Sequence, residues 1–172
     1  MVRRIIILGG IQVGWFSCVQ GASNGRPVLG PVVVLLVVGL YGFWVTAGWP
    51  FLRSAVRVIA IGVVADGLLA MTGVISFSPI ANVGWPSPLW MVALWLNIVP
   101  ALDDLGSFLG PGIMVPAIAG AICGPLAYFA GSALGALTLA SPIPGALGII
   151  GLEWAVAMPL LLKVRPCEEI RV

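Results

Sequence analysis

The sequence predicts an all-α, polytopic membrane helix bundle that forms one integral domain over residues 1–172. Two observations predict this class. The chain is 60% hydrophobic and only 8% of its residues are charged, whereas soluble domains carry roughly 25% charged residues. In addition, the apolar residues form runs long enough to cross a bilayer. Lipid is therefore the expected solvent.

Six apolar runs are expected to be transmembrane helices, at about residues 5–22, 28–49, 55–77, 86–102, 112–131 and 143–162. The first could also be a signal peptide, but Gln12, Trp15 and Gln20 interrupt it and no small-residue cleavage site follows, so a retained helix is expected. Pro50 is expected to close the second run. Residues 132–144 contain two prolines and few bulky side chains, which favours a helix extension and an outside loop over a re-entrant segment.

The basic residues test this topology. With the N-terminus in the cytoplasm, seven of the eight fall on the cytoplasmic side and only Arg26 falls outside, as the positive-inside rule requires. The seven are Arg3, Arg4, Arg53, Arg57, Lys163, Arg165 and Arg171. An odd number of helices would break the agreement. No internal repeat is evident in the sequence, so an inverted-repeat transporter architecture is not expected.

Composition also excludes several kinds of chemistry. The chain has no histidine, which removes histidine-ligated haem, histidine metal sites and histidine general bases. Cys18, Cys123 and Cys167 form no Cys-x-x-Cys pair, so neither a zinc site nor a disulfide framework is supported. A net charge of +2 gives no reason to expect nucleic acid. We expect no cofactor and no metal, and we expect membrane lipids as partners.

Two acidic residues lie near the middle of predicted helices. Asp66 is halfway along the third and Glu153 is halfway along the sixth. A carboxylate at the bilayer centre costs several kcal/mol unless it is protonated, paired or hydrated, and no basic residue is expected at that depth. The two acids lie at similar depth and could face one another, which makes them candidate catalytic residues. The alternative is that each carboxyl only bonds a helix carbonyl.

Asn97 and Tyr128 complete the candidate ligand-binding set with Asp66 and Glu153. Asn97 lies inside the fourth predicted helix, where a buried amide needs partners. Tyr128 is the large polar-tipped residue on a face of small residues in the fifth helix, which comprises Ala117, Gly120, Gly124, Ala127, Tyr128 and Gly131. A similar face in the third helix comprises Gly62, Asp66, Ala70 and Gly73. Such faces allow close helix packing, expected here within one chain, and the oligomeric state stays open.

Two further groups have structural interpretations. Asp103 and Asp104 follow the fourth run, and an ion-pair cluster with Arg53 and Arg57 is favoured over a Mg²⁺ site. Among the tryptophans, Trp49, Trp85 and Trp90 lie near the ends of runs, where interfacial aromatic belts are expected. Trp95 and Trp154 lie deeper, where each N–H is expected to bond a carbonyl.

Four phrases carry a resemblance to a known family: QVGWFSCV, DGLLAMTGVISF, PLWMVALW and GPLAYFAGSALGAL. Their order and spacing resemble the bacterial inner-membrane family named domain of unknown function 2878, over nearly the whole chain. The resemblance implies a multi-pass inner-membrane protein. Its members tend to be encoded beside genes for membrane fatty-acid modification, which implies a role in the envelope or with lipids. The family pattern has Asn-His where this chain has Asp103-Asp104, so a role of that histidine does not carry over.

Three functions remain open at this point, and whether the protein is an enzyme remains open with them. The first is binding or modifying a lipid or isoprenoid-like ligand in an intramembrane polar cavity. The second is proton-coupled transport of a small solute. The third is a structural membrane subunit without its own chemistry. A lipid-facing side opening would favour the first, a path between both surfaces the second, and a solid core the third.

The charge distribution generates a topology prediction. Reporter fusions at Arg4 and at Val172 should both report the cytoplasm, because six crossings return the chain to its starting side. Reports from opposite compartments would contradict the six-helix count.

Overall fold

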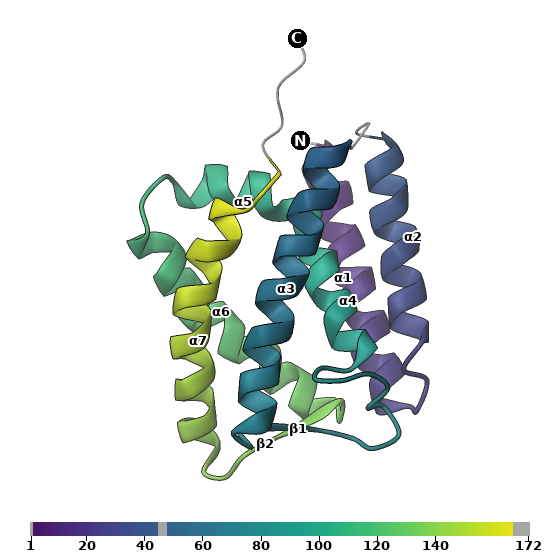
Figure 1. Ribbon diagram of the computed structural model, residues 1–172, viewed down its shortest axis with the longest axis vertical. Coiled ribbons are helices and arrows are strands. Elements are labelled where there is room, and N and C mark those ends of the chain that lie inside the picture. Colours follow the sequence, from purple (N-terminus) through teal and green to yellow (C-terminus); the bar gives the residue numbers. More distant parts are fainter. Residues whose placement is uncertain (1, 45–47, 167–172) are drawn as a thin grey trace.

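The computed structural model describes residues 2–44 and 48–166 as a helical bundle closed at one end by a two-stranded ladder (Figure 1). The helices are α1 (Val2–Ser23), α2 (Leu29–Trp44), α3 (Trp49–Met71), α4 (Leu89–Ile98), α5 (Leu102–Leu109), α6 (Met114–Ala133) and α7 (Ile143–Lys163). The strands are β1 (Ile75–Phe77) and β2 (Leu137–Leu139). A 3-10 turn over Val99–Ala101 joins α4 to α5.

The predicted fold class is confirmed. Five stretches of the described chain are long and apolar enough to cross a membrane: Arg3–Ser23, Trp49–Met71, Leu89–Leu109, Met114–Ala133 and Ile143–Lys163. The apolar part of α2, Leu29–Gly42, is shorter, and α2 runs beside α1 through the bundle (Figure 1). The chain is a multi-pass membrane protein.

Several predicted boundaries were wrong. Pro50 opens α3 instead of closing the second run, because a proline in the first turn of a helix loses no hydrogen bond. The helix ends at Met71 because Gly73 adopts φ +75°, and Ile75–Phe77 continues as β1. The fourth run does not stop at residue 102 but turns into α5, which lies across the end of the bundle (Figure 1). In the segment 132–144, Leu137–Leu139 forms β2.

The described basic residues, except Arg26, gather at one end of the bundle. The starts of α1 and α3 meet the end of α7 there (Figure 1), and Ser54 Oγ donates to the carbonyl of Val164 at 2.7 Å. Arg26 lies at the other end, between α1 and α2. Cys167, Arg171 and Val172 fall outside the described residues. The two ends therefore differ in charge as the sequence suggested, and their assignment to compartments stays a prediction.

The predicted acidic cluster exists with different partners. Asp104 Oδ1 accepts a hydrogen bond from Arg4 Nε at 3.0 Å, and its Oδ2 lies 3.9 Å from Arg3. Asp103 lies 3.6 Å from Arg165. These arginines come from the two ends of the described chain, whereas the sequence pointed to Arg53 and Arg57. The Arg53 guanidinium instead lies 5.5 Å from the centre of the Trp49 ring.

The structure reveals an internal repeat that is not evident in the sequence, with its two units in parallel orientation. The unit α3–β1–α4 matches α6–β2–α7 in element order and direction (Figure 1). In the first part of the repeat, equivalent residues lie 62 positions apart, so Gly62, Asp66 and Gly73 match Gly124, Tyr128 and Gly135. In the second part, Trp95 and Pro100 match Trp154 and Pro159, 59 positions apart.

Equivalent elements of the two units have the same local structure. Gly73 and Gly135 both have positive φ and end their helices. In each unit the amide after the glycine donates to a carbonyl five residues earlier, Val74 to Leu69 and Ala136 to Gly131, which is the Schellman pattern. A short strand then follows in both units.

Contacts between equivalent residues place an approximate two-fold axis between the units. In the antiparallel ladder, Ser76 pairs with its own equivalent Thr138, and the pairs on either side are symmetric about it. Asp66 is hydrogen-bonded to its equivalent Tyr128, and Trp95 stacks on its equivalent Trp154. Only residues on a two-fold axis can contact their own equivalents in this way. Because both units run in the same direction, the axis lies along the bundle.

The glycines of the repeat serve as packing sites for the tryptophans. A Cβ at Gly62 would overlap the Trp95 ring, and a Cβ at Gly124 would overlap the Trp154 ring. Gly120 also faces α7, against the carbonyl of Trp154. The predicted small face of α6 therefore packs within the chain, along α7.

We predict that Gly124→Leu destabilises the bundle by about 1–3 kcal/mol or more, because the new side chain must displace the Trp154 ring. Gly148→Leu is the matched control, since a Cβ at that exposed position of α7 meets nothing within 4 Å. Thermal unfolding in detergent would measure both variants. Equal stability of Gly124→Leu and the control would contradict the packing described here.

Candidate functional site

A buried hydrogen-bond network lies on the two-fold axis. Asp66, on α3, is fully buried. Trp95 Nε1, from α4, donates to Asp66 Oδ2 at 2.6 Å, and the Tyr128 hydroxyl, from α6, donates to Asp66 Oδ1. Two donors stabilise a carboxylate in an apolar medium, so the network ties three helices together through one acidic side chain.

The Trp95–Trp154 pair lies next to this network. The two rings stack with their centroids 5.1 Å apart and their planes 15° apart, an arrangement open to Trp95 only because Gly62 has no side chain. The indole N–H of Trp154 is buried near the Tyr128 hydroxyl, without a hydrogen bond of ordinary geometry. The sequence predicted that the Trp95 N–H bonds a backbone carbonyl, but in the structure it bonds the Asp66 carboxyl group instead.

Glu153 is close to the network but does not join it. Its carboxyl lies near enough to Asp66 for two negative charges to repel. Both of its oxygens are buried, and neither has a hydrogen-bond partner among the described residues. Nothing described here stabilises a charge on Glu153, in contrast to Asp66. The structure therefore brings the two predicted acids into one region and gives them different surroundings.

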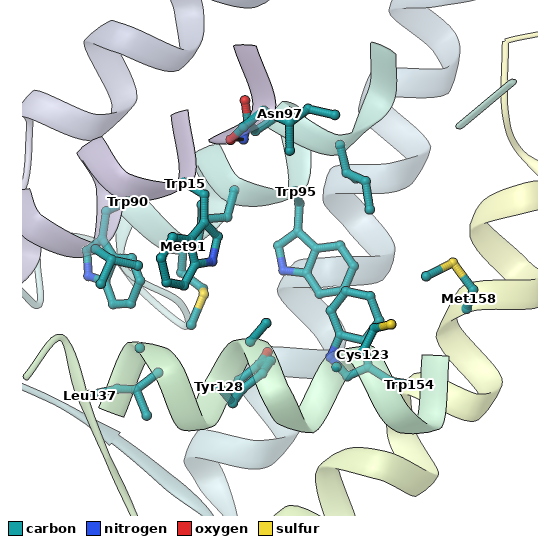
Figure 2. Close-up of a pocket in the computed structure, with 17 residues that line it drawn as sticks. Trp15, Trp90, Met91, Trp95, Asn97, Cys123, Tyr128, Leu137, Trp154 and Met158 are labelled. Atoms are coloured by element: carbon teal, nitrogen blue, oxygen red, sulfur yellow. Dashed lines mark hydrogen bonds between the residues drawn. The ribbon is translucent and has the colours of Figure 1, made fainter. Parts of the chain in front are cut away.

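An aromatic pocket of about 240 Å³ adjoins the network (Figure 2). It lies between α1 and α4 on one side and α6 and α7 on the other. Its walls are mainly aromatic and aliphatic, with four tryptophans among them: Trp15, Trp90, Trp95 and Trp154. Tyr128 and Asn97 supply polar atoms. Asp66 and Glu153 do not line it, so Asp66 lies behind the Tyr128 and Trp95 side chains to which it bonds.

Asn97 occupies the end of this pocket nearest the charged end of the bundle. Its side chain is 2% exposed, and Nδ2 donates to the carbonyl of Ile11 at 2.9 Å. Gly14 leaves room for this carboxamide, because a Cβ there would overlap it. The Oδ1 atom is buried without a partner among the described residues. A donor group on a bound molecule could satisfy it.

Some of the residues that line the pocket also lie on the outer surface of the bundle. Cys123, on α6, lines the pocket and is exposed, and Ile11 and Ala127 are partly exposed. In a membrane this surface faces acyl chains.

No group of three or more potential metal-binding side chains occurs in the described part of the chain. The paired aspartates of α5 are engaged with arginines. The polar groups described at the pocket are the Tyr128 hydroxyl, which is hydrogen-bonded to Asp66, and the Asn97 carboxamide.

Comparison with known proteins places the chain in a family. A family model described as protein of unknown function, DUF2878, matches residues 4–160. The chain belongs to the DUF2878 family. The match confirms the resemblance seen in the sequence phrases. No curated protein and no solved structure matches this DUF2878 chain.

Some residues of the candidate site in this DUF2878 protein were missed from the sequence. Trp95 and Trp154 were interpreted as simple packing residues, and Trp90 was placed at the membrane interface, although it is 1% exposed and lines the pocket. Trp85, at 89% exposed, does lie on the surface. The sequence contains the spacing Trp-x-x-x-x-Pro twice, beginning at Trp95 and at Trp154. This shared spacing is the signal that could have identified the two tryptophans as equivalent residues.

We predict that Asp66→Ala destabilises the protein by about 1–3 kcal/mol for each of the two donors left unsatisfied. Asp66→Asn should retain most of the stability, because its amide oxygen accepts from Trp95 and its NH₂ donates to the Tyr128 oxygen. Glu153→Gln should leave the free energy of unfolding nearly unchanged, since Glu153 makes no hydrogen bond among the described residues. Equilibrium unfolding in detergent would measure all three. An Asp66→Ala protein as stable as wild type would contradict the network.

Proposed function

We propose that this protein binds the apolar chain of a lipid or isoprenoid-like molecule inside the inner membrane, in the aromatic pocket beside Tyr128. The observation that carries this proposal is the pocket's position. It lies inside a membrane bundle, it is lined by four tryptophans, and Cys123 in its wall is exposed on the outside of the bundle. An apolar chain already dissolved in the bilayer can enter there without crossing water.

The chemistry of the walls supports the same ligand class. A small polar solute would have to leave its hydrogen bonds in water for walls that offer few polar groups, which is costly. An apolar chain loses little and gains contacts with flat aromatic rings. Ligand sites of this kind are mostly apolar, with a few polar groups that fix the orientation of the ligand. Tyr128 and Asn97 are the polar groups that would do so here.

Asp66 has a supporting role in this proposal. It accepts hydrogen bonds from the Tyr128 hydroxyl and the Trp95 N–H, so it holds two walls of the pocket at once. The Tyr128 oxygen keeps lone pairs that can accept a hydrogen bond from a hydroxyl on the bound molecule. Modification of that molecule would require Tyr128 as the proton-exchanging group, with Asp66 as its partner.

Proton-coupled transport of a small solute is the second candidate, and the internal repeat favours it. Transporters built from parallel repeats have their sites at the repeat interface near the bilayer midplane. Here the interface holds Asp66, with Glu153 close by and without hydrogen bonds. This function needs water to reach the site, whereas lipid binding needs acyl chains to reach it.

Tryptophan fluorescence separates the two candidates. In a variant with Trp44, Trp49 and Trp85 replaced by phenylalanine, all four remaining tryptophans line the pocket. Phosphatidylcholine with brominated acyl chains should quench this emission in bilayers, and aqueous acrylamide should not. Ala127→Phe, which fills the pocket, should reduce the bromine quenching.

Leu126→Phe is the control, because Leu126 is exposed on the neighbouring face of α6 and does not line the pocket. Equal bromine quenching with and without Ala127→Phe would contradict entry of acyl chains. Strong quenching by acrylamide would instead support the transport function.

A further inference from the structure

A second pocket, of about 590 Å³, lies between α1, α2 and the 3-10 turn after α4. It shares Ile11 and Asn97 with the aromatic pocket, so the two adjoin at these residues. The other described walls are mostly aliphatic, and Arg3 lies at the far end. The two pockets therefore follow one another from the charged end of the bundle to the axis network.

One face of α1 lines both pockets without a break. Arg3, Ile7 and Ile11 line the second pocket, and Ile11, Trp15 and Val19 line the aromatic pocket. Steps of four residues keep these side chains on one side of a helix. Arg3 and Val19 are sixteen residues apart, which corresponds to about 24 Å along the axis. This exceeds the depth of one leaflet, about half of a 30 Å hydrocarbon core.

We propose that the two pockets form one elongated site for a single long hydrocarbon chain with an anionic head, with the head beside Arg3 and the chain end in the aromatic pocket. This inference rests on the proposed lipid-binding function and specifies its ligand. A free fatty acid and an anionic phospholipid share this chemistry, and the experiment below distinguishes them.

The charges at the two ends set the orientation of the chain. The outer end has Arg3 in its wall, with a half-exposed side chain whose guanidinium lies 3.9 Å from Asp104 Oδ2. The inner end lies in front of the acids Asp66 and Glu153. A negative head would be attracted by the arginine at the first end, whereas the second end offers it no basic side chain. An apolar chain end, in contrast, suits the tryptophan-lined walls.

Asn97 and Ile11 form the junction through which such a chain must pass. Asn97 is fixed there by its bond to the Ile11 carbonyl and by its fit against Gly14. Ile11 lines both pockets, so a larger side chain at this position would separate them. The site thus has one residue whose enlargement blocks the inner pocket without filling the outer one.

Photo-crosslinking with two hexadecanoic acids tests this arrangement, one with a diazirine near the carboxylate and one with a diazirine near the methyl end. The first should label Ile6–Ile11. The second should label Met91, Tyr128 or Met158 in the aromatic pocket. Ile11→Phe should abolish the second pattern and keep the first, and Leu8→Phe, at an exposed position of α1, should keep both.

Further probes define the head. The matching hexadecanol should label about tenfold more weakly, because it loses a charge-assisted contact with Arg3. A phosphatidylglycerol with the same photoreactive chain is then compared with the acid. The probe that saturates labelling at the lower concentration identifies the source of the anionic head.

The outcomes separate this inference from the proposed function. A reversed pattern, labelling confined to one pocket by both acids, or equal labelling by the alcohol would overturn the elongated anionic-chain site while lipid binding stands. Labelling of neither pocket by any of these probes would overturn the proposed function as well.

Discussion

The rest of the structure depends on one buried carboxyl group and its two hydrogen-bond donors. Asp66 lies on α3, fully buried in a bundle that has lipid as its solvent, and it is bonded by Trp95 and Tyr128 from two other helices. Such a group is costly alone and stabilising when its donors are in place. It therefore fixes the distance between the two repeat units, and it fixes two walls of the aromatic pocket at the same time.

The site arises where the two repeat units differ. Their backbone pattern is shared, and it places Asp66 against Tyr128 and Trp95 against Trp154 on the axis. The side chains that differ supply the polarity. Glu153 stands where the first unit has Leu94, and Asn97 stands where the second has Val156. The α1–α2 hairpin then packs against α4 and provides the remaining wall, so that the axis becomes the inner end of a pocket.

The sequence predicted the fold class, because composition and run length report directly on lipid exposure. It could not predict the partner of Asp66, since Trp95 and Tyr128 are distant in sequence and reach it only through tertiary packing. The repeat was hidden for a similar reason. Apolar positions facing lipid are interchangeable, so only a few glycines, tryptophans and prolines preserve it. Placing Trp90 at the interface failed because the loop before α4 folds inward and leaves Trp85, not Trp90, on the surface.

The indole region of a ¹⁵N–¹H NMR spectrum tests the central claim most directly, because each of the seven tryptophans gives one N–H signal. The Trp95 signal, assigned by Trp95→Phe, should exchange slowly with deuterated water and move strongly in Asp66→Asn. The Trp85 signal should exchange fast and stay unchanged. A Trp95 signal that exchanges as fast as that of Trp85, or that does not respond to Asp66→Asn, would contradict the buried network.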